Sequence, residues 1–313
     1  MKALIYNGLD SVALVDRPIP KVQSPTDAII KLTYTSICET DLHILKGHVP
    51  TVKTGTIIGH EGVGVVSEIG AEVKRFVKGD RVLISCMSSC GSCTYCQKGM
   101  YAHCSTGGWT LGNTLDGTQA QYVRVILADG SLHHIPDGVD ETALVMFSDN
   151  IPEGFECGTL NGRVQPGSTV AIIGAGGVGL SALMTALLYS PSVLIVIEND
   201  PNRLKLAGKL GALRLINPDE EDAEGVVKTL TGGVGCEAVI EAGGNPETFE
   251  LAQKIVAPGG TIANTGFHAE KVDLHLETLW YHHINVNFSD IESAYRVFGS
   301  RYENSVLKMV VAM

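Results

Sequence analysis

The sequence predicts an α/β protein with two domains, a β-rich domain followed by a domain built on a parallel sheet. Its 313 residues, at about 150 residues per domain, are enough for two buried cores. Up to about residue 125, short apolar segments are separated by Gly, Pro and Asp, which is typical of a barrel-like β domain. From Ser168 onward, apolar strands alternate with helical segments, which indicates βαβ units.

The individual elements follow from these local patterns. In the first domain the expected strands include 28–34, 62–69, 81–85 and 120–127. In the second domain the expected strands are 169–173, 193–198, 214–217, 237–240 and 260–264, and the expected helices are 177–190, 202–210, 223–230 and 247–256. A last helix over 290–299 and a strand over 306–311 are expected to close the chain.

One long uncharged stretch, residues 164–197, has the length of a membrane span. Glycines at 174, 176, 177 and 179 interrupt it, and Ser190-Pro191 ends its second half. A buried strand, a glycine turn, a buried helix and a second strand explain the stretch better. We therefore expect no membrane association.

Composition narrows the class of protein. Apolar residues make up 44% and charged residues 18%, which is an ordinary globular balance. The formal net charge is −11 and no cluster of Lys or Arg occurs, which disfavours nucleic acid as a partner. The first residues lack the apolar region of a signal peptide, so we expect a cytoplasmic protein in a reducing environment. There, clustered cysteines are more typical of a metal site than of disulfides.

Five of the eight cysteines lie between Cys86 and Cys104. Four of them follow the spacing C-x2-C-x2-C-x7-C and are Cys90, Cys93, Cys96 and Cys104. Four thiolates from one loop can surround a tetrahedral Zn²⁺ and leave no position for substrate, so this zinc would be structural. Free thiols and an iron–sulfur cluster are the alternatives. Cys86, Cys157 and Cys236 are interpreted as buried or spare thiols.

A nucleotide-binding turn is predicted where the first strand of the second domain ends. The residues are Gly174, Ala175, Gly176, Gly177, Val178 and Gly179, and an apolar helix follows. Such glycines allow the pyrophosphate of a dinucleotide to approach the helix N-terminus. Glu198 ends the next strand, where a carboxylate accepts hydrogen bonds from the adenosine ribose and repels a 2′-phosphate. NAD is therefore favoured over NADP, a preference that Arg203 could soften.

Five motifs occur in a fixed order along nearly the whole chain. They are CETDLH from Cys38, GHEGVG from Gly59, the four-cysteine loop, SDNIPEGF from Ser148 and GAGGVG from Gly174. Each motif alone is weak, but the ordered set resembles the zinc-dependent medium-chain alcohol dehydrogenases. The resemblance implies a GroES-like β-barrel catalytic domain over 1–149 and 287–313, and an NAD-binding Rossmann domain over 150–286.

The resemblance also implies roles for individual residues. Cys38, His60 and Asp149 would hold a catalytic zinc with one position open to a substrate oxygen, giving two zinc ions per chain with the structural one. Asp41 would orient His60, and Glu61 would act near the metal during ligand exchange. Thr40 and His43 would carry the proton of the alcohol toward the surface. Gly266 and Lys308 join the cofactor site.

The implied activity is the reversible oxidation of an alcohol to an aldehyde or ketone with NAD, in a homodimer or homotetramer. Primary alcohols, secondary alcohols and polyols all remain open as substrates. Relative to the family, about 30 residues, one strand–helix–strand unit, are missing between 286 and 287. The alternative is therefore an impaired or non-catalytic zinc- and nucleotide-binding member of the same fold.

Overall fold

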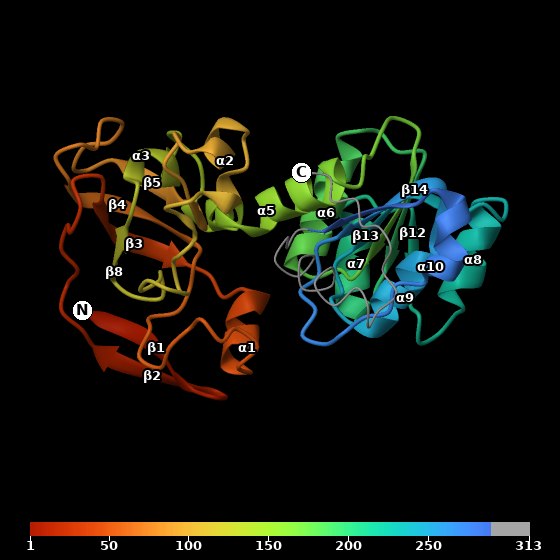
Figure 1. Ribbon diagram of the computed structural model, residues 1–313, viewed down its shortest axis with the longest axis horizontal. Helices are drawn as coiled ribbons and strands as arrows, with labels where there is room; N and C mark the ends of the chain where they lie inside the picture. Colours follow the sequence, from red (N-terminus) through yellow and green to blue (C-terminus); the bar gives the residue numbers. More distant parts are fainter. Residues whose placement is uncertain (289–313) are drawn as a thin grey trace. The chain divides into compact units, whose positions relative to one another are not determined.

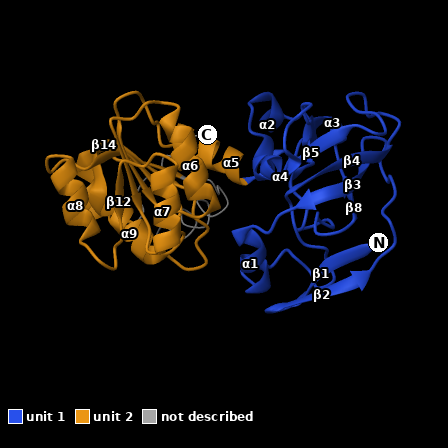
Figure 2. Ribbon diagram, turned by 180° about the vertical axis from the view of Figure 1, so that it is seen from behind, with its two compact units in different colours: residues 1–149 blue, residues 150–313 orange. Residues whose placement is uncertain are grey.

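The computed structural model describes residues 1–288 and divides into two compact units (Figure 2). The first is Met1–Asp149, and the second begins at Asn150. Each unit has its own hydrophobic core, and each is described by itself below.

The first unit is built on a five-stranded antiparallel sheet in the order β8-β3-β4-β5-β9. Its strands are β3 (Ala28–Thr35), β4 (Gly62–Ile69), β5 (Arg81–Ile84), β8 (Tyr122–Val125) and β9 (Leu132–His134). Inward-facing residues such as Ile30, Val82 and Val123 pack around the fully buried Phe76. Alternate residues of a strand point to opposite faces, so the alternating sequence pattern produces this one-sided core.

Smaller elements surround this sheet. The hairpin of β1 (Lys2–Gly8) and β2 (Ser11–Asp16) packs with helix α1 (Glu39–Leu45) around a second core that includes Tyr6 and Ile44. The remaining elements are β6 (Met87–Ser88), β7 (Gly108–Trp109), α2 (Thr94–Gln97), η1 (Tyr101–His103), α3 (Ala128–Ser131), α4 (Glu141–Leu144) and η2 (Val145–Ser148).

The second unit contains a six-stranded, wholly parallel sheet in the order β12-β11-β10-β13-β14-β15. The strands are β10 (Thr169–Ile173), β11 (Val193–Ile197), β12 (Arg214–Ile216), β13 (Cys236–Glu241), β14 (Val256–Asn264) and β15 (Asn285–Phe288). The order reverses between β10 and β13, which is the doubly wound arrangement of a Rossmann fold. The predicted fold class is therefore confirmed.

Helices cover both faces of this sheet (Figure 1). Val170 and Ile172 of β10 pack in one core with α6 and α7, whereas Ala171 and Ile173 pack in the other with α8 and α9. Strands buried on both faces become almost wholly apolar, which explains the uncharged stretch of the sequence. The helices are α5 (Asn150–Glu153), the π-helix η3 (Gly154–Leu160), α6 (Gly177–Leu187), α7 (Pro201–Lys209), α8 (Ala223–Leu230), α9 (Pro246–Ile255), α10 (Leu276–Leu279) and η4 (Trp280–His282).

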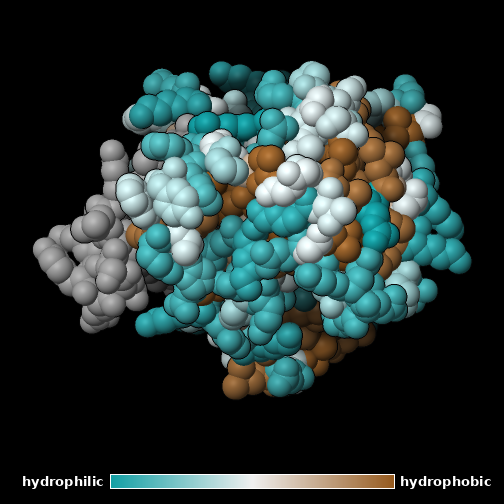
Figure 3. Space-filling view, turned by 90° about the vertical axis from the view of Figure 1, so that its right-hand side faces the viewer, coloured by the Kyte–Doolittle hydropathy of each residue, from teal (hydrophilic) through white to brown (hydrophobic). Residues whose placement is uncertain are grey.

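Burial leaves a mainly hydrophilic surface on the face shown in Figure 3, with hydrophobic side chains between the polar ones. Among residues 1–288, no helix is long and apolar enough to cross a membrane.

The end of the described chain lies at the edge of the second unit's sheet. Strand β15 pairs with β14, with Asn287 opposite Ala263 and Phe288 opposite Asn264. The sheet therefore extends two residues past the domain boundary expected at 286/287. The expected helix over 290–299, the strand over 306–311 and Lys308 lie outside the described residues.

A pH-dependent ion pair is predicted to stabilise the second unit. His275 Nε2 lies 2.6 Å from Glu250 Oε2 on α9, and this hydrogen bond is the main reason that the pKa of His275 is raised above its usual 6.5. Stabilisation from a raised histidine pKa is complete below the unfolded value and is lost as the pH rises through the folded value. Both side chains are partly exposed, so the contribution should stay below about 1 kcal/mol.

We therefore expect His275→Ala to lower the urea midpoint of unfolding more at pH 6 than at pH 8.5. An equal loss at the two pH values would show that the ion pair does not contribute.

Candidate functional site

Three possible metal ligands from distant parts of the first unit meet at one point. Cys38 directly precedes α1, His60 lies just before β4, and Asp149 directly follows η2. The Cys38 Sγ atom, an imidazole nitrogen of His60 and a carboxylate oxygen of Asp149 lie within 4.8 Å of one another. His60 Nε2 is 3.4 Å from Asp149 Oδ2, and Cys38 Sγ is 3.8 Å from the same oxygen.

The chemistry of this cluster fits zinc. Thiolate, imidazole and carboxylate are all zinc ligands, and three protein ligands leave one tetrahedral position open. Cys38 is 8% exposed and His60 is 3% exposed, so water competes poorly for these donors. Burying ionisable groups together is costly unless a partner compensates them, and a cation would supply that compensation.

The ligands influence each other's protonation. Burial raises the pKa of the Cys38 thiol, partly opposed by its hydrogen bond with His60. Burial acts to lower the pKa of His60, but hydrogen bonds to Asp149 and Cys38 outweigh this and raise it well above its usual value. Burial likewise opposes ionisation of Asp149, yet the hydrogen bond from His60 lowers its pKa. A metal must therefore displace protons from Cys38 and His60 when it binds.

A second layer of polar residues supports the cluster. Asp41 is 2% exposed, and its Oδ2 accepts hydrogen bonds from the Cys38 backbone N–H at 3.0 Å and from Gln119 Nε2 at 2.9 Å. Its Oδ1 faces His60 Nδ1 at 4.0 Å. Neither of these last two atoms has a hydrogen-bond partner within residues 1–288. A carboxylate facing the second ring nitrogen is the kind of group that orients a metal-bound histidine.

Cys86, interpreted from the sequence as a buried or spare thiol, is buried beside the candidate site. Its Sγ donates to Asp149 Oδ1 at 2.9 Å. The side chain is only 6% exposed. Cys86 therefore belongs to the surroundings of the candidate metal site.

Helix α1 carries the two residues expected to move a proton. Thr40 and His43 are three positions apart and so share one side of the helix. Thr40 Oγ1 lies 3.7 Å from Cys38 Sγ. His43 Nδ1 lies 3.0 Å from Nδ1 of His48, which is exposed. Burial, followed by the nearby His48, lowers the pKa of His43.

Glu61 lies fully inside the first unit. It is 1% exposed, and its Oε2 accepts a hydrogen bond from Ser36 Oγ. Thr35 Oγ1 donates to the Glu61 backbone carbonyl at 2.8 Å. The residue is thus held both through its side chain and through its backbone.

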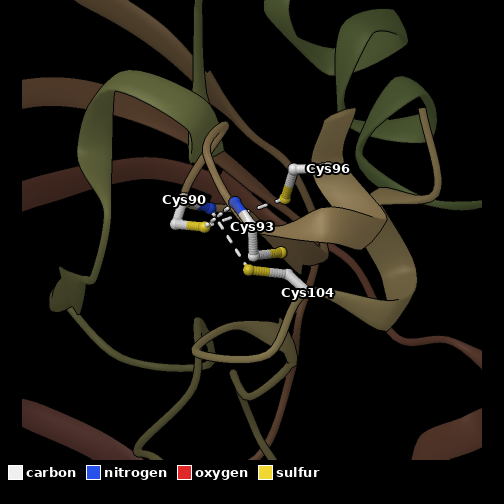
Figure 4. A group of neighbouring side chains, drawn as sticks. All are labelled: Cys90, Cys93, Cys96 and Cys104. Carbon is white, nitrogen blue, oxygen red and sulfur yellow. Dashed lines mark hydrogen bonds between the residues drawn. The ribbon is translucent and has the colours of Figure 1, made fainter. Parts of the chain in front are cut away.

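The four-cysteine loop forms a second cluster in the same unit (Figure 4). The four sulfur atoms lie within 4.8 Å of one another, and all four cysteines are free thiols: Cys90, Cys93, Cys96 and Cys104. Backbone N–H groups of Cys90 and Cys93 donate to the sulfurs of Cys104 and Cys90, each at 3.3 Å. Such bonds favour thiolates, and a hydrogen bond from the Ser92 backbone is the main reason that the pKa of Cys90 falls to about 5. All four donors are sulfur, so a zinc ion here would have a closed shell.

The glycine turn of the second unit has the geometry that a dinucleotide site requires. Gly174 has φ +92°, a conformation that L side chains rarely adopt. A Cβ on Gly179 would lie 2.0 Å from the Gly174 carbonyl oxygen, and one on Gly177 would lie 2.4 Å from Asn150 Oδ1. By contrast, a Cβ on Gly176, the N-cap of α6, would meet nothing within 4 Å. The space in front of this helix terminus is therefore open. Val178 lies in the first turn of α6.

Glu198 lies beside this turn. Its Oε2 accepts from the Ala175 backbone N–H at 2.7 Å, and its Oε1 accepts from the Asp200 N–H at 2.9 Å. Arg203 Nη1 is 3.9 Å from the Glu198 Oε2 atom, and its side chain is 55% exposed. The expected ribose-binding carboxylate is therefore placed next to the expected phosphate-binding backbone.

Gly266 follows β14 and lies against the buried carboxylate of Glu241, which was not predicted from the sequence. A Cβ on Gly266 would lie 2.6 Å from Glu241 Oε2. Glu241 is 0% exposed, and its Oε1 accepts from the N–H groups of Gly243 and Gly244 at 2.8 and 2.9 Å. It thereby shapes the loop at the carboxyl end of β13, beside the point where the strand order reverses.

Two family models match the chain. "Alcohol dehydrogenase GroES-like domain" matches residues 24–137, and "Zinc-binding dehydrogenase" matches residues 177–310. An alcohol dehydrogenase from Cupriavidus necator is 36% identical over 88% of this chain and 79% of its own length. The chain belongs to the zinc-type alcohol dehydrogenase family. The resemblance seen in the motifs is thus confirmed.

Other relatives are matched over different shares of their own length, and the name of one gives NADP as its cofactor. Zinc-type alcohol dehydrogenase B of Aspergillus flavus is 39% identical over 86% of this chain, which spans 64% of that protein's length. The apo form of zinc-dependent alcohol dehydrogenase 2 from Streptococcus pneumoniae has a TM-score of 0.88 and 42% identity, and the match covers 100% of this chain and 99% of that one. An NADP-dependent isopropanol dehydrogenase from Thermoanaerobacter brockii is 33% identical over 86% of this chain and 77% of its own length.

The positions of three supporting residues could not be predicted from the sequence. They are Gln119, Cys86 and Glu241. Gln119 and Asp41 are 78 residues apart, and Cys86 and Asp149 are 63 apart. No local spacing links such residues. Only Glu241 had a possible signal, an acidic residue at the end of an apolar strand followed by Ala-Gly-Gly.

Alanine substitutions at Gly176 and Gly179 of the turn are expected to have different effects on stability and on cofactor binding. Gly176→Ala fits the folded protein but places a methyl group in the space in front of α6, so we expect near-normal thermal unfolding and at least about tenfold weaker NADH binding. Gly179→Ala clashes with the Gly174 carbonyl and should lower both the unfolding temperature and NADH affinity. Thermal melts and NADH fluorescence titrations measure these effects. Wild-type NADH affinity in Gly176→Ala would show that the cofactor does not cross this turn.

Proposed function

We propose that this protein is an NAD-dependent zinc alcohol dehydrogenase that interconverts a small alcohol and its aldehyde or ketone. The observation that carries the proposal is the contrast between the two donor clusters. Cys38, His60 and Asp149 provide three ligands and leave one position open, whereas the four cysteines provide a complete shell. The glycine turn and Glu198 support a nicotinamide cofactor as hydride acceptor.

The protein's own residues hold and tune the catalytic ion. Zinc bound by Cys38, His60 and Asp149 supplies Lewis-acid polarisation of the substrate oxygen. Asp41 orients the imidazole of His60, and Gln119 holds Asp41 through its 2.9 Å hydrogen bond. Burial of this cluster limits competing water and strengthens the electrostatic interactions within it.

A route for the alcohol proton starts on helix α1. In this proposal Thr40 Oγ1 accepts the alcohol proton as it releases its own hydroxyl proton, which the imidazole of His43 takes up toward solvent. The lowered pKa of His43 keeps this imidazole neutral near pH 7 and able to accept a proton. Its Nδ1 contact with exposed His48 offers an exit from the partly buried site.

The carboxylate of Glu198 favours NAD over NADP. It lies against the turn that would hold the pyrophosphate, where it can accept hydrogen bonds from the ribose hydroxyls and would repel a 2′-phosphate. Arg203 lies near it, and the related isopropanol dehydrogenase is NADP-dependent by name, so the preference for NAD needs a test of its own.

A panel of primary alcohols, secondary alcohols and polyols tests the activity, with NADH formation read at 340 nm on zinc-loaded protein. We expect turnover with at least one class, and its loss in His60→Ala. His133→Ala, an exposed histidine of the first unit outside both clusters, is the matched control and should keep the activity. A protein that binds zinc and NADH but oxidises no alcohol in the panel would support the impaired alternative.

The cofactor preference has its own test. Glu198→Gln removes the charge and keeps one acceptor oxygen, so one of the Ala175 and Asp200 N–H groups retains its hydrogen bond and the other loses it. Hydrogen bonds to a charged group contribute about 1.5–3 kcal/mol, so we expect the ratio of kcat/KM for NAD to that for NADP to fall about 10- to 100-fold. An unchanged ratio would show that Glu198 does not contact the ribose.

A further inference from the structure

Cys86 makes two hydrogen bonds to the segment that carries Asp149. Its side chain, 6% exposed, places Sγ 2.9 Å from Asp149 Oδ1. Its backbone N–H donates to the carbonyl of Ser148, the residue before Asp149, at 3.0 Å. Cys86 itself lies in the short link between β5 and β6, and β5 is an inner strand of the antiparallel sheet. It is thereby anchored to the rigid part of the first unit.

The two oxygens of Asp149 have different partners. Oδ2 faces the other members of the cluster, at 3.4 Å from His60 Nε2 and 3.8 Å from Cys38 Sγ. Oδ1 faces the Cys86 thiol. An ionised carboxylate can only accept hydrogen bonds, so the thiol is the donor in this short contact. Cys86 thus occupies one carboxylate oxygen and leaves the other directed at the cluster.

We propose that Cys86 is a positioning residue that holds Asp149 as a one-oxygen ligand of the catalytic metal. The inference rests on the metal site of the proposed function and assigns a role in it to a residue outside its ligand set. A carboxylate that bound through both oxygens would fill the coordination position that a substrate oxygen needs. The Cys86 hydrogen bond opposes this and also fixes the rotation of the carboxylate.

Two simpler roles for Cys86 make different predictions. If it were itself a ligand, its sulfur would belong to the set of donors within 4.8 Å of one another, which consists of Cys38, His60 and Asp149. If it only filled space, then a substitution would act through packing, and its effect would not depend on Asp149.

The experiment measures metal affinity without substrate. Wild type, Cys86→Ala and Cys86→Ser are loaded with Zn²⁺ and challenged with a chelator, and the Co²⁺-substituted proteins are compared by visible absorption. Cys236→Ala is the control, because this thiol is 0% exposed in the core of the second unit. Each variant is also placed in an Asp149→Asn background.

We expect Cys86→Ala to weaken metal binding at the Cys38–His60–Asp149 cluster about 10- to 100-fold and to shift the Co²⁺ absorption bands. Metal at the four-cysteine loop should stay bound. Cys86→Ser keeps a donor and should restore part of the affinity, while Cys236→Ala should match wild type. In the Asp149→Asn background, Cys86→Ala should weaken metal binding much less. There the charged acceptor of the Cys86 thiol has already been replaced by a neutral amide.

Wild-type affinity and spectrum in Cys86→Ala would overturn the proposal. An equal loss with and without the Asp149 carboxylate would also overturn it, because the effect would then be packing. If Cys86→Ala does not fold, Cys86→Ser takes its place. Its loss of metal affinity is then compared between the wild-type and Asp149→Asn backgrounds. If the proposed function is wrong but the role of Cys86 is right, the variants will show the expected changes in metal affinity while wild type oxidises no alcohol.

Discussion

The first unit brings three buried ionisable side chains to one point, and their donor set fits a zinc ion. Cys38, His60 and Asp149 are brought together from three separate segments, and His60 is almost completely buried. Facing atoms of Asp41 and His60 lack hydrogen-bond partners within residues 1–288. A folded protein rarely keeps such an arrangement for stability alone, because the desolvation of each charge is costly. Function explains the arrangement better, since a bound metal satisfies the donors and gains an open position for chemistry.

The main constraint in the second unit is different: its glycine turn must let an anion approach the backbone closely. The turn after β10 needs a positive φ at Gly174 and near-contact between Gly174 and Gly179. These tight positions leave open space only at Gly176, in front of the helix N-terminus, where free N–H groups attract negative charge. The apolar strands around the turn hold it rigidly. Glu198 then adds the feature that distinguishes one nucleotide from another.

Local patterns in the sequence were sufficient for most of the fold. The alternation of apolar strand segments with helical segments predicted β10 through β14 and their helices, because strands buried on both faces form continuous apolar runs. Cysteine spacing likewise predicted a cluster that the chain forms within one loop. Periodicity could not predict that residues 154–160 form a π-helix, or that β15 continues to Phe288. Those details depend on packing against other elements, such as the hydrogen bond from Thr159 Oγ1 of the π-helix to the Ala182 carbonyl of α6 at 3.3 Å.

The metal site shows the same division between local and long-range information. Its ligands could be proposed only because ordered motifs resembled a family, since Cys38 and Asp149 are 111 residues apart. The supporting residues, Gln119 and Cys86, have no motif of their own. Their roles depend on which backbone segments the antiparallel sheet brings together. Supporting contacts of this kind therefore become visible only in three dimensions.

We propose that each chain holds two zinc ions in chemically different sites. Anomalous diffraction at the zinc absorption edge, on crystals of the zinc-loaded protein, tests this directly. The account predicts one peak contacted by Cys38, His60 and Asp149, and a second peak enclosed by the four cysteine sulfurs. A peak in the four-cysteine loop alone would contradict it.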